Sequence, residues 1–355
     1  MSNVALQGIS KQFKQSIALR DVSFSINDGE FFVLLGPTGS GKTTTLRVIA
    51  GLEKQDEGSV SFDGHLVDKL VPSDRDVAFV FQQYSLYPTM TVYDNLAFPL
   101  RSPLRHLPEA EIRSRITKAA ETLRISHLLE RKTAKLSGGE MQRVSIGRAI
   151  VREPRIFLMD EPLSNLDAKL RESLRVELKH IQKTQASTTL FVTHDQIEAL
   201  TMADRIGVLL NGRIVQVGTP HDIYDRPTTT FVAQLVGSPR INLLQATRDD
   251  LSLRIPNSTI KLPVPTTKNL PASFLLGVRP EDVRPSEGGT LVGRVGLIEP
   301  LGVETVIHIR SGEQSLTSII SGMTNLRIGD DVQYDIALDR LHYFDADGKR
   351  ITVSQ

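Results

Sequence analysis

The segment GPTGSGKTT at 36–44 has the residue types and the spacing of a phosphate-binding loop. It matches G-x-x-x-x-G-K-[ST], in which backbone N–H groups surround the phosphates, the lysine reaches the β and γ oxygens, and the hydroxyl ligates Mg²⁺. The pattern does not match G-x-G-x-x-G, which argues against a dinucleotide site. The candidate nucleotide-binding residues are Gly36, Pro37, Thr38, Gly39, Ser40, Gly41, Lys42, Thr43 and Thr44, and Thr43 is also a candidate metal ligand.

Two acidic residues end a second apolar segment, RIFLMDEP at 155–162. We expect Asp160 to hold Mg²⁺, directly or through water, and Glu161 to accept a proton from the attacking water. An Asp-Glu pair after a strand is often structural. A phosphate-binding loop in the same chain favours the catalytic interpretation.

A second candidate anion site lies in LSGGEMQRVSIGRA at 136–149. Ser137 and Glu140 stand in the S-x-x-E order of a capping box, which predicts that a helix begins there. The free N–H groups and the dipole of a helix start favour anions. The candidate residues are Ser137, Gly138, Gly139 and Glu140. A second helix start of this kind is useful only against the side of a nucleotide that the first loop leaves exposed.

The apolar patterns around these segments predict a two-domain α/β protein. Residues 30–52 read as a strand, a loop and a helix marked by Leu46, Ile49 and Leu52, and further strands are expected at 155–162, 188–195 and 204–218. A helix at 164–183 carries Leu170, Leu174, Leu178 and Ile181 on one side. Helical patterns dominate from 84 to about 150, and short strands between turns dominate after 236. We therefore predict a domain at 1–235 with an inserted helical subdomain at about 84–150, and an all-β domain at 236–355.

The bulk composition excludes several classes of function. A length of 355 residues suits two domains, and a net charge of +1 argues against a nucleic-acid partner. The absence of cysteine excludes disulfides and thiolate metal sites. The N-terminus lacks the apolar core of a secretory signal, and stretches such as FFVLL at 31–35 are far shorter than the ~20 residues that span a bilayer. We expect any work at a membrane to be done through partner chains.

An ordered set of five motifs resembles the nucleotide-binding subunit of ABC transporters. The motifs are GPTGSGKTT, FQQYSLYP, LSGGEMQR, IFLMDEPLSNLD and FVTHD, and the resemblance covers residues 1 to about 235. GSPRINLL and GVRPEDV in the tail resemble the regulatory domain of the maltose-type ATPases of carbohydrate importers. The resemblance implies an α/β P-loop ATPase domain with a helical insertion, followed by an all-β, OB-like regulatory and dimerisation domain.

The resemblance also implies roles for single residues. Phe13 would stack on adenine, where Tyr or Trp is more usual in the family; the alternative is a packed strand residue. Gln82 would contact Mg²⁺ and water and sense the membrane partner, although Gln83 beside it leaves the register open. Asp167 would belong to the loop that communicates between two nucleotide sites.

Two more positions follow from the same comparison. His194 would contact the γ-phosphate and hold Glu161 and the water in place, so the catalytic set is Glu161, His194 and Lys42. Glu140 stands where many relatives have Gln, and either residue completes a capping box. The metal ligands would be Thr43, Gln82 and Asp160.

The implied partners are ATP with Mg²⁺, a second copy of the chain and two transmembrane permease subunits. The two copies would pair head to tail, so that each site combines one phosphate-binding loop with the LSGGE segment of the other copy. The chain would lie peripherally on the cytoplasmic face of the cell (inner) membrane, and an extracytoplasmic solute-binding protein would act indirectly. Residues 84–100 would form part of the groove that receives a permease helix, and Tyr84, Leu86, Tyr87 and Pro88 would face it; the alternative is that most of these residues form the core of the helical subdomain.

The function expected from this set is ATP hydrolysis that powers import of a sugar, a glycoside or a polyol. A polyamine or a phosphate ester is the alternative solute, and a soluble, non-transport ABC ATPase is the alternative function. A GTPase is disfavoured because no [NT]-K-x-D segment occurs, and a kinase would have no use for LSGGE.

Overall fold

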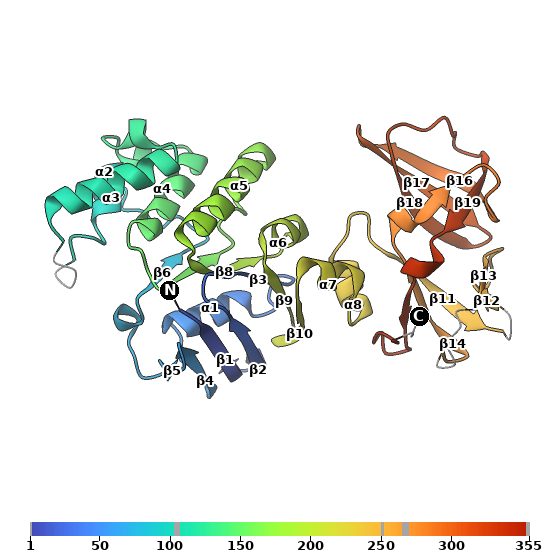
Figure 1. The fold of residues 1–355 in the computed structure, drawn as a ribbon, viewed down its shortest axis with the longest axis horizontal. Coiled ribbons are helices and arrows are strands. Elements are labelled where there is room, and N and C mark those ends of the chain that lie inside the picture. The colour runs from blue at the N-terminus through green and yellow to red at the C-terminus, as the bar shows by residue number, and fades with distance from the viewer. Residues whose placement is uncertain (1, 103–106, 250–251, 265–269, 353–355) are drawn as a thin grey trace. The chain divides into compact units, whose positions relative to one another are not determined.

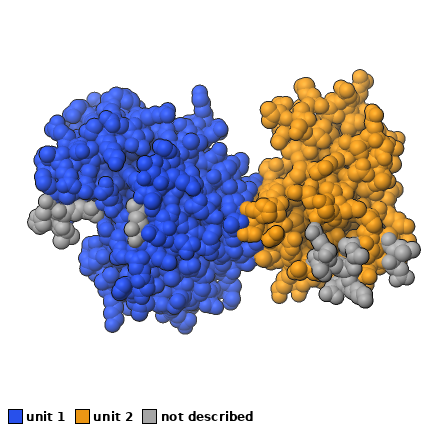
Figure 2. Space-filling view, in the orientation of Figure 1, with its two compact units in different colours: residues 1–220 blue, residues 221–355 orange. Residues whose placement is uncertain are grey.

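The structure is a computed structural model that describes residues 2–102, 107–249, 252–264 and 270–352 (Figure 1). The chain forms two compact units, residues 1–220 and 221–355 (Figure 2). The border between the units precedes the domain boundary that we predicted at 235. The segment between the two positions holds two short helices, α7 (Pro220–Asp225) and α8 (Thr230–Leu235).

A six-stranded sheet forms the centre of the first unit, with the strand order β10-β9-β3-β8-β7-β6. Its strands are β3 (Phe31–Leu35), β6 (Val77–Val80), β7 (Ile156–Asp160), β8 (Thr188–Thr193), β9 (Arg205–Leu210) and β10 (Arg213–Gly218). All neighbours pair in parallel except β10, which forms a hairpin with β9 across Asn211 and Gly212. Every residue of β3, β7 and β8 is buried, as expected for central parallel strands covered on both faces.

An antiparallel sheet packs against the central sheet, with the strand order β2-β1-β4-β5. Its strands are β1 (Val4–Phe13), β2 (Ser16–Ile26), β4 (Glu57–Phe62) and β5 (His65–Leu66). Apolar residues of both sheets and of α1 (Lys42–Ala50) form one buried cluster. Within it, the rings of Phe24 and Phe32 stack with centroids 5.0 Å apart.

The predicted helix after the phosphate-binding loop is shorter than expected at its C-terminal end. Leu46 and Ile49 are buried in α1, as predicted. Leu52 lies beyond the helix and is 48% exposed, so its assignment to the apolar face was wrong. The reason is Gly51, which adopts φ 74° and ends the helix in a left-handed cap.

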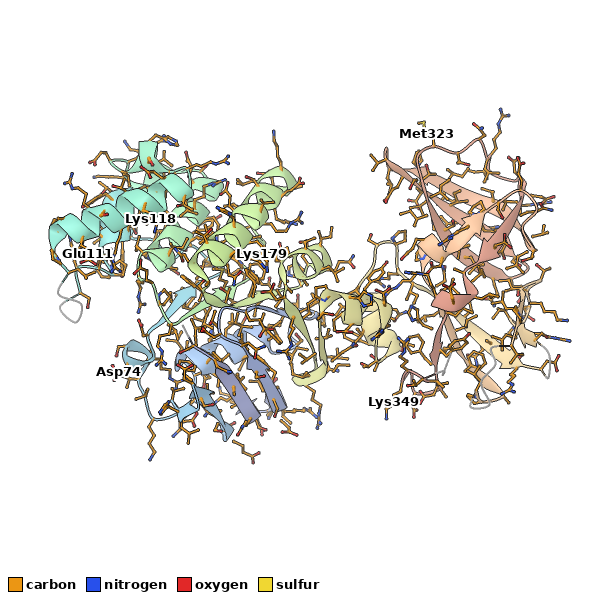
Figure 3. The ribbon with its side chains drawn as sticks, viewed as in Figure 1. Asp74, Glu111, Lys118, Lys179, Met323 and Lys349 are labelled. Carbon is orange, nitrogen blue, oxygen red and sulfur yellow. The ribbon has the colours of Figure 1, made fainter. Side chains whose placement is uncertain are left out.

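Helices fill the segment between β6 and β7, as predicted. They are α2 (Val92–Ala97), α3 (Glu109–Thr122) and α4 (Gly138–Ile150), with 3₁₀ turns at Ser126–Leu128 and Thr133–Lys135; a further turn, Pro72–Arg75, precedes β6. On α3, Ile112 and Ile116 are buried while Lys118 is exposed (Figure 3).

Two more helices complete the first unit. They are α5 (Ala168–Gln185) and α6 (Gln196–Met202). On α5, Leu174, Leu178 and Ile181 are buried, which confirms the predicted apolar side. No helix among the residues that the structure describes is long and apolar enough to cross a membrane.

The second unit is built from two five-stranded antiparallel sheets. The first has the order β13-β12-β11-β14-β20, with β11 (Asn242–Arg248), β12 (Ser252–Arg254), β13 (Lys261–Pro263), β14 (Ser273–Val278) and β20 (His342–Phe344). The second has the order β15-β19-β16-β17-β18, with β15 (Val283–Pro285), β16 (Leu291–Pro300), β17 (Glu304–Ser311), β18 (Gln314–Ser321) and β19 (Asp331–Ile336). Short 3₁₀ turns lie at Pro280–Asp282 and Leu338–Arg340.

The second of these sheets curls until its two edge strands meet. Ser318 on β18 donates its hydroxyl hydrogen bond to the carbonyl oxygen of Val283 on β15, at 2.5 Å. An antiparallel sheet whose edges approach in this way is nearly a closed barrel. The all-β, OB-like prediction for the tail is confirmed.

The tail motif GVRPEDV has a structural use within the second unit. The guanidinium of Arg279 donates to the carbonyl oxygens of Ala233, Val236 and Tyr224, at 2.6–3.0 Å. It also lies 4.0 Å from the ring centroid of Tyr224. Burial lowers the pKa of Arg279. Arg279 therefore ties the ends of α7 and α8 to the sheet that carries β14.

Candidate active site

The phosphate-binding loop connects β3 to α1, and the surrounding backbone leaves no room for a side chain at Gly36 or Gly41. Gly41 adopts φ 108°, and a Cβ atom there would lie 2.5 Å from the carbonyl oxygen of Ala18 on β2. The backbone N–H of Gly212 donates to the carbonyl oxygen of Ser40 at 2.9 Å. The loop is thus fixed between the β2 strand and the β9–β10 turn, which holds its N–H groups at the start of α1.

Lys42 folds back over this loop. Its Nζ donates to the carbonyl oxygens of Gly36 at 3.0 Å and Pro37 at 3.1 Å, and it lies 3.4 Å from Oε1 of Glu161. The Lys42 side chain is only 5% exposed. A buried ammonium group needs such partners, and phosphate oxygens are stronger acceptors than carbonyls for the same donor.

Thr43 and Asp160 meet at the ends of α1 and β7. The Thr43 hydroxyl donates to Oδ1 of Asp160 at 2.9 Å. Burial raises the pKa of Asp160, and the neighbouring Glu161 raises it further, while the Thr43 hydrogen bond lowers it. A nearby cation stabilises the charged form of a buried carboxylate. Carboxylate and hydroxyl oxygens are also the ligands that Mg²⁺ prefers.

Glu161 lies at the centre of the predicted catalytic set. Its Oε2 is 3.1 Å from Nδ1 of His194 and accepts a long hydrogen bond from Nε2 of Gln82 at 3.5 Å. Gln82, rather than Gln83, is therefore the glutamine whose amide reaches the carboxylate of Glu161. Glu161 adopts φ 43°, a left-handed conformation that is costly for a residue with a side chain. The strained turn directs its carboxylate to Lys42, Gln82 and His194 together.

Phe13 is the last residue of β1 and pairs with Ser16 of β2. Its side chain is 42% exposed, and Nζ of Lys11 lies 5.1 Å from the ring centroid. The strand that pairs with it, β2, contacts the loop through Ala18. An exposed ring at this position is open to stacking by a flat ligand. Its role as the adenine platform stays a prediction.

The predicted capping box at the start of α4 is present. The Ser137 hydroxyl accepts from the N–H of Glu140 at 3.4 Å, and the N–H of Ser137 donates to Oε2 of Glu140 at 2.7 Å. The latter bond lowers the pKa of Glu140. A Cβ atom on Gly139 would lie 2.1 Å from Leu170 of α5, so this helix start packs tightly on α5. Among the described residues, no hydrogen bond or ion pair joins Ser137 to the loop at 36–44.

Asp167 caps the neighbouring helix. Its Oδ1 accepts from the N–H of Leu170 at 3.0 Å, which begins α5 beside Gly139. Sequence reasoning missed Asn165, whose Nδ2 donates to the carbonyl oxygen of Gln82 at 3.2 Å. Asn165 stands inside the quoted IFLMDEPLSNLD motif, so its amide was the available signal. Its contact ties the segment after Glu161 to the segment that carries Gln82.

A groove of about 350 Å³ is lined in part by residues of β6 and α4. It is lined by Tyr87, Phe98, Pro99 and Arg148, among others. The rings of Tyr87 and Phe98 are 4.6 Å apart, and the guanidinium of Arg148 lies 5.5 Å from the Tyr87 centroid. Burial lowers the pKa of Arg148. Of the other residues expected to face a partner, Pro88 is exposed while Tyr84 and Leu86 are half-buried.

Two family models match this chain. The ABC transporter model matches residues 19–164, and the TOBE domain model matches residues 276–344. Similar proteins include the sn-glycerol-3-phosphate import ATP-binding protein UgpC of Rhizobium meliloti, which is 45% identical over 360 residues and covers 99% of this chain and 100% of that protein. The trehalose/maltose import ATP-binding protein MalK of Thermococcus litoralis is 44% identical over 379 residues, with 97% and 98% of the two chains covered.

Solved structures of ATP-binding cassettes also match this chain. A dimeric ATP-binding cassette in a post-hydrolysis state, bound to ADP and phosphate, is 32% identical and has a TM-score of 0.56. The match covers 61% of this chain and 98% of the chain of the cassette. The resemblance noted from the motifs thus extends over the full sequence and the fold. This chain belongs to the ATP-binding subunits of ABC transporters, which are ATPases, and carries a TOBE domain behind its ATPase domain.

Proposed function

We propose that this chain hydrolyses ATP as a head-to-tail dimer and thereby powers solute import through two separate transmembrane subunits. The observation that carries the catalytic part is the position of Glu161, whose carboxylate lies 3.4 Å from Lys42 Nζ and 3.1 Å from His194 Nδ1. A base, a cation and an imidazole converge on one point beside the loop. Such a cluster serves in-line phosphoryl transfer, which depends on positioning and charge.

The proposed reaction assigns one task to each residue. Glu161 accepts a proton from water as the water oxygen bonds to the γ-phosphorus and the bond from phosphorus to the β–γ bridging oxygen breaks. His194 holds Oε2 of Glu161 and orients the carboxylate. Lys42 exchanges the carbonyls of Gly36 and Pro37 for β and γ oxygens, which offsets the charge that collects there. Phe13 stacks on the adenine.

The residues near Thr43 fit Mg²⁺. The Thr43 hydroxyl, the Asp160 carboxylate and the Gln82 amide supply oxygen donors, the chemistry that this ion prefers. No group of three or more His, Asp or Glu side chains suited to a metal occurs among the described residues. A magnesium ion would therefore take its remaining ligands from phosphate oxygens and water, and it would offset phosphate charge when bound.

The pairing of two copies explains the second helix start. Gly139 is packed against Leu170 of α5, and among the described residues Ser137 forms no hydrogen bond with the loop of its own chain. We propose that they close the nucleotide site of the other copy. The solved cassette that matches this chain supports the proposal, because it is a dimer and the match covers 98% of its chain.

The groove lined by Tyr87, Phe98 and Arg148 suits a helix of the transmembrane subunit. It presents exposed aromatic faces beside a partly desolvated guanidinium, a pattern enriched at protein interfaces. It begins a few residues after Gln82, which itself reaches Glu161. A helix seated there would be linked to the catalytic carboxylate through one short segment. We infer that the chain works at the inner face of the cell membrane for this reason.

The names of the relatives limit the classes of solute that we consider. UgpC is named for sn-glycerol 3-phosphate and MalK for trehalose and maltose, at 45% and 44% identity to this chain. We propose that the solute is a sugar, a polyol or a polyol phosphate. The phosphate-ester alternative therefore has at least as much support as the neutral sugars.

The transport assignment is tested by purifying the tagged chain from detergent-solubilised membranes. Two transmembrane subunits should accompany it. In proteoliposomes, ATP hydrolysis should rise when the solute-binding protein is added with its solute. Trehalose, maltose and sn-glycerol 3-phosphate are the first solutes to compare. Recovery of the chain with DNA or ribosomes, and never with membrane proteins, would support the non-transport alternative instead.

A further inference from the structure

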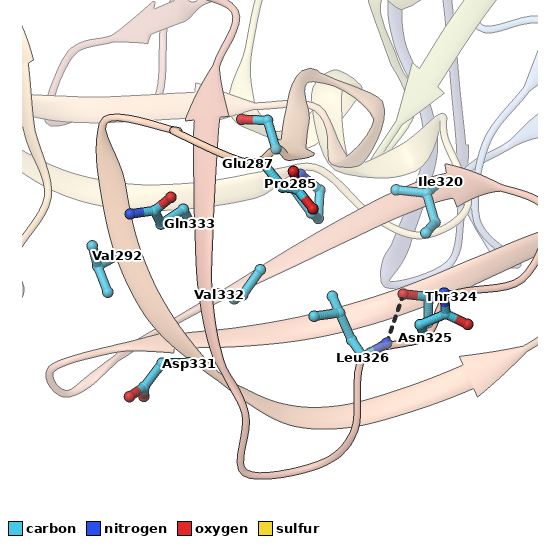
Figure 4. A pocket seen from close by; sticks show the side chains of 11 residues that line it. Pro285, Glu287, Val292, Ile320, Thr324, Asn325, Leu326, Asp331, Val332 and Gln333 are labelled. Carbon is cyan, nitrogen blue, oxygen red and sulfur yellow. Dashed lines mark hydrogen bonds between the residues drawn. The ribbon is translucent and has the colours of Figure 1, made fainter.

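A hollow of about 670 Å³ opens in the second unit (Figure 4). It lies at the seam of the curled sheet, which is the line along which its edge strands β15 and β18 approach each other. The seam is closed by the hydrogen bond from Ser318 to Val283. Pro285 and Ile320 lie two positions further along the two edge strands, and both line the hollow. Pro285 still pairs with β19, but a proline has no N–H, so β15 cannot donate a backbone hydrogen bond to β18 at this position. The opening is therefore a consequence of where β15 ends.

The floor of the hollow is apolar and fixed. Val332 is 5% exposed and belongs to the core of the unit, and Leu326 and Ile320 pack against that core. The Thr324 hydroxyl accepts from the N–H of Leu326 at 3.2 Å, which holds the turn that brings Leu326 inward. The hollow is thus formed before any ligand arrives. Its volume falls in the range of about 300–1,000 Å³ that is usual for small-molecule sites.

The rim carries polar groups that are available to a ligand. Neither Glu287 nor Asn325 forms a side-chain hydrogen bond with another residue that the structure describes. Gln333 uses Oε1 to accept from the N–H of Gly288 at 2.8 Å, and its Nε2 remains a donor. Asp331 is paired with Arg294, at 3.1 Å between its Oδ1 and Nε.

The charge of the lining selects against anions. The eleven lining residues include the carboxylates of Glu287 and Asp331, and no Lys, Arg or His is among them. The ion pair with Arg294 offsets one of the two carboxylates, so the remaining field is weakly negative. A phosphate group would be desolvated there without a cation to pair with it.

We propose that this hollow binds a neutral, polyhydroxylated small molecule, such as a polyol or a mono- or disaccharide. Hydroxyl groups of the ligand would donate to the carboxylates, and the amides of Asn325 and Gln333 would donate and accept. The C–H face of the ligand would lie on the floor formed by Ile320, Leu326 and Val332. This site is separate from the nucleotide site, and its assignment does not depend on the transport function.

Ligand-observed NMR titrations of the full chain test the proposal. The probes are sorbitol, maltose, trehalose, sn-glycerol 3-phosphate and spermidine at pH 7. At least one neutral probe should bind saturably, with one site per chain, whether or not ATP is present. Glycerol 3-phosphate should bind at least about tenfold more weakly than the best neutral probe. If only spermidine or glycerol 3-phosphate binds, the proposed ligand class is wrong.

Three variants locate the bound probe. Val292 lines the hollow and is 52% exposed, so Val292→Phe should fill the site without disturbing the core and should weaken binding at least about tenfold. Asn325→Ala should weaken binding by about two- to tenfold through a lost hydrogen bond. Glu304→Gln, an exposed change at the start of β17, is the matched control and should leave binding unchanged. Saturable binding that Val292→Phe does not alter would place the ligand elsewhere and overturn the proposal.

Discussion

Oε2 of Glu161 lies 3.1 Å from Nδ1 of His194, although 33 positions separate the two residues in the chain. Glu161 follows β7 and His194 follows β8, and these strands are parallel neighbours with Asp160 opposite Val192. Because parallel strands end at the same edge of a sheet, the residues after their last positions meet there. The adjacent strands therefore bring together the two side chains to which we assign complementary tasks in the proposed reaction.

Glu161→Gln should leave ATP binding intact and lower the hydrolysis rate by at least about 100-fold. An amide keeps the shape of the carboxylate but cannot accept the proton. The ATP-bound dimer should accumulate, which size-exclusion chromatography with ATP can measure. The control is Glu57→Gln, an exposed change on β4. Hydrolysis by Glu161→Gln at close to the native rate would show that Glu161 is not the base.

Mixed dimers should show that Ser137 serves the nucleotide of the partner. Pairing a Lys42→Ala chain with a Ser137→Arg chain should spoil one site twice and leave the other intact. Pairing the native chain with a chain that carries both changes should spoil each site once. Tightly bound ATP, counted per isolated dimer, should be higher in the first pairing. The reverse order would mean that the two motifs act within one chain.

Phe98→Asp should weaken the association with transmembrane subunits while ATP binding by the isolated chain stays unchanged. Phe98 is 48% exposed and lines the groove beside Tyr87, so a carboxylate there would face an apolar partner surface. Val176→Asp is the matched control, because Val176 is 64% exposed on α5 and does not line that groove. Equal recovery of membrane subunits with both variants would exclude the groove as the docking site.

A fragment of residues 1–220 should be soluble and bind ATP, and it should behave better than a fragment of residues 1–235. The longer fragment retains α8 without the sheet that covers it. Ala233 packs with Ile241 and Phe344 in the full chain, and its carbonyl oxygen accepts from Arg279. These groups would be exposed at the end of the longer fragment. Light scattering and ATP titration compare the two, and a monodisperse 1–235 beside an aggregating 1–220 would favour the boundary expected from the sequence.

The second unit should lose stability in acid because of His342. Burial, and then the charges of Arg350, Arg279 and Arg340, lower the pKa of His342 from 6.5 to about 3. Between these values the unfolded chain binds a proton that the folded chain does not, so the free energy of unfolding falls as the pH falls from 6.5 towards 3. The contribution is fully present above pH 6.5.

His342→Leu removes this titration and keeps a side chain of similar size. Its free energy of unfolding should fall less steeply in the same pH window, by up to about 1.4 kcal/mol per pH unit. Urea unfolding followed by circular dichroism at several pH values measures both slopes. His65→Leu is the control, since His65 is exposed on β5. Identical slopes for native chain and His342→Leu would show that His342 does not carry the acid sensitivity.

The sequence by itself was sufficient for the elements that depend on local patterns. The apolar segment before Gly36, the capping box of Ser137 and Glu140 and the apolar side of α5 all lie within a few residues of their own signals. Their hydrogen bonds and burial are set by neighbours in the chain, which is why spacing alone predicts them. The prediction for Leu52 was wrong because Gly51, in a left-handed conformation, ends the helix before it.

Only the tertiary structure decided how these elements meet. Asn165 reaches the backbone of Gln82, and Leu170 fills the space beside Gly139, through contacts between segments far apart in the chain. The tie from Arg279 to α7 and α8 and the open seam at Pro285 likewise depend on strand order and strand length in the second unit. Local patterns contain no information on which strand ends beside which. That order follows from burying the apolar faces of all strands at once, and it is a property of the whole chain.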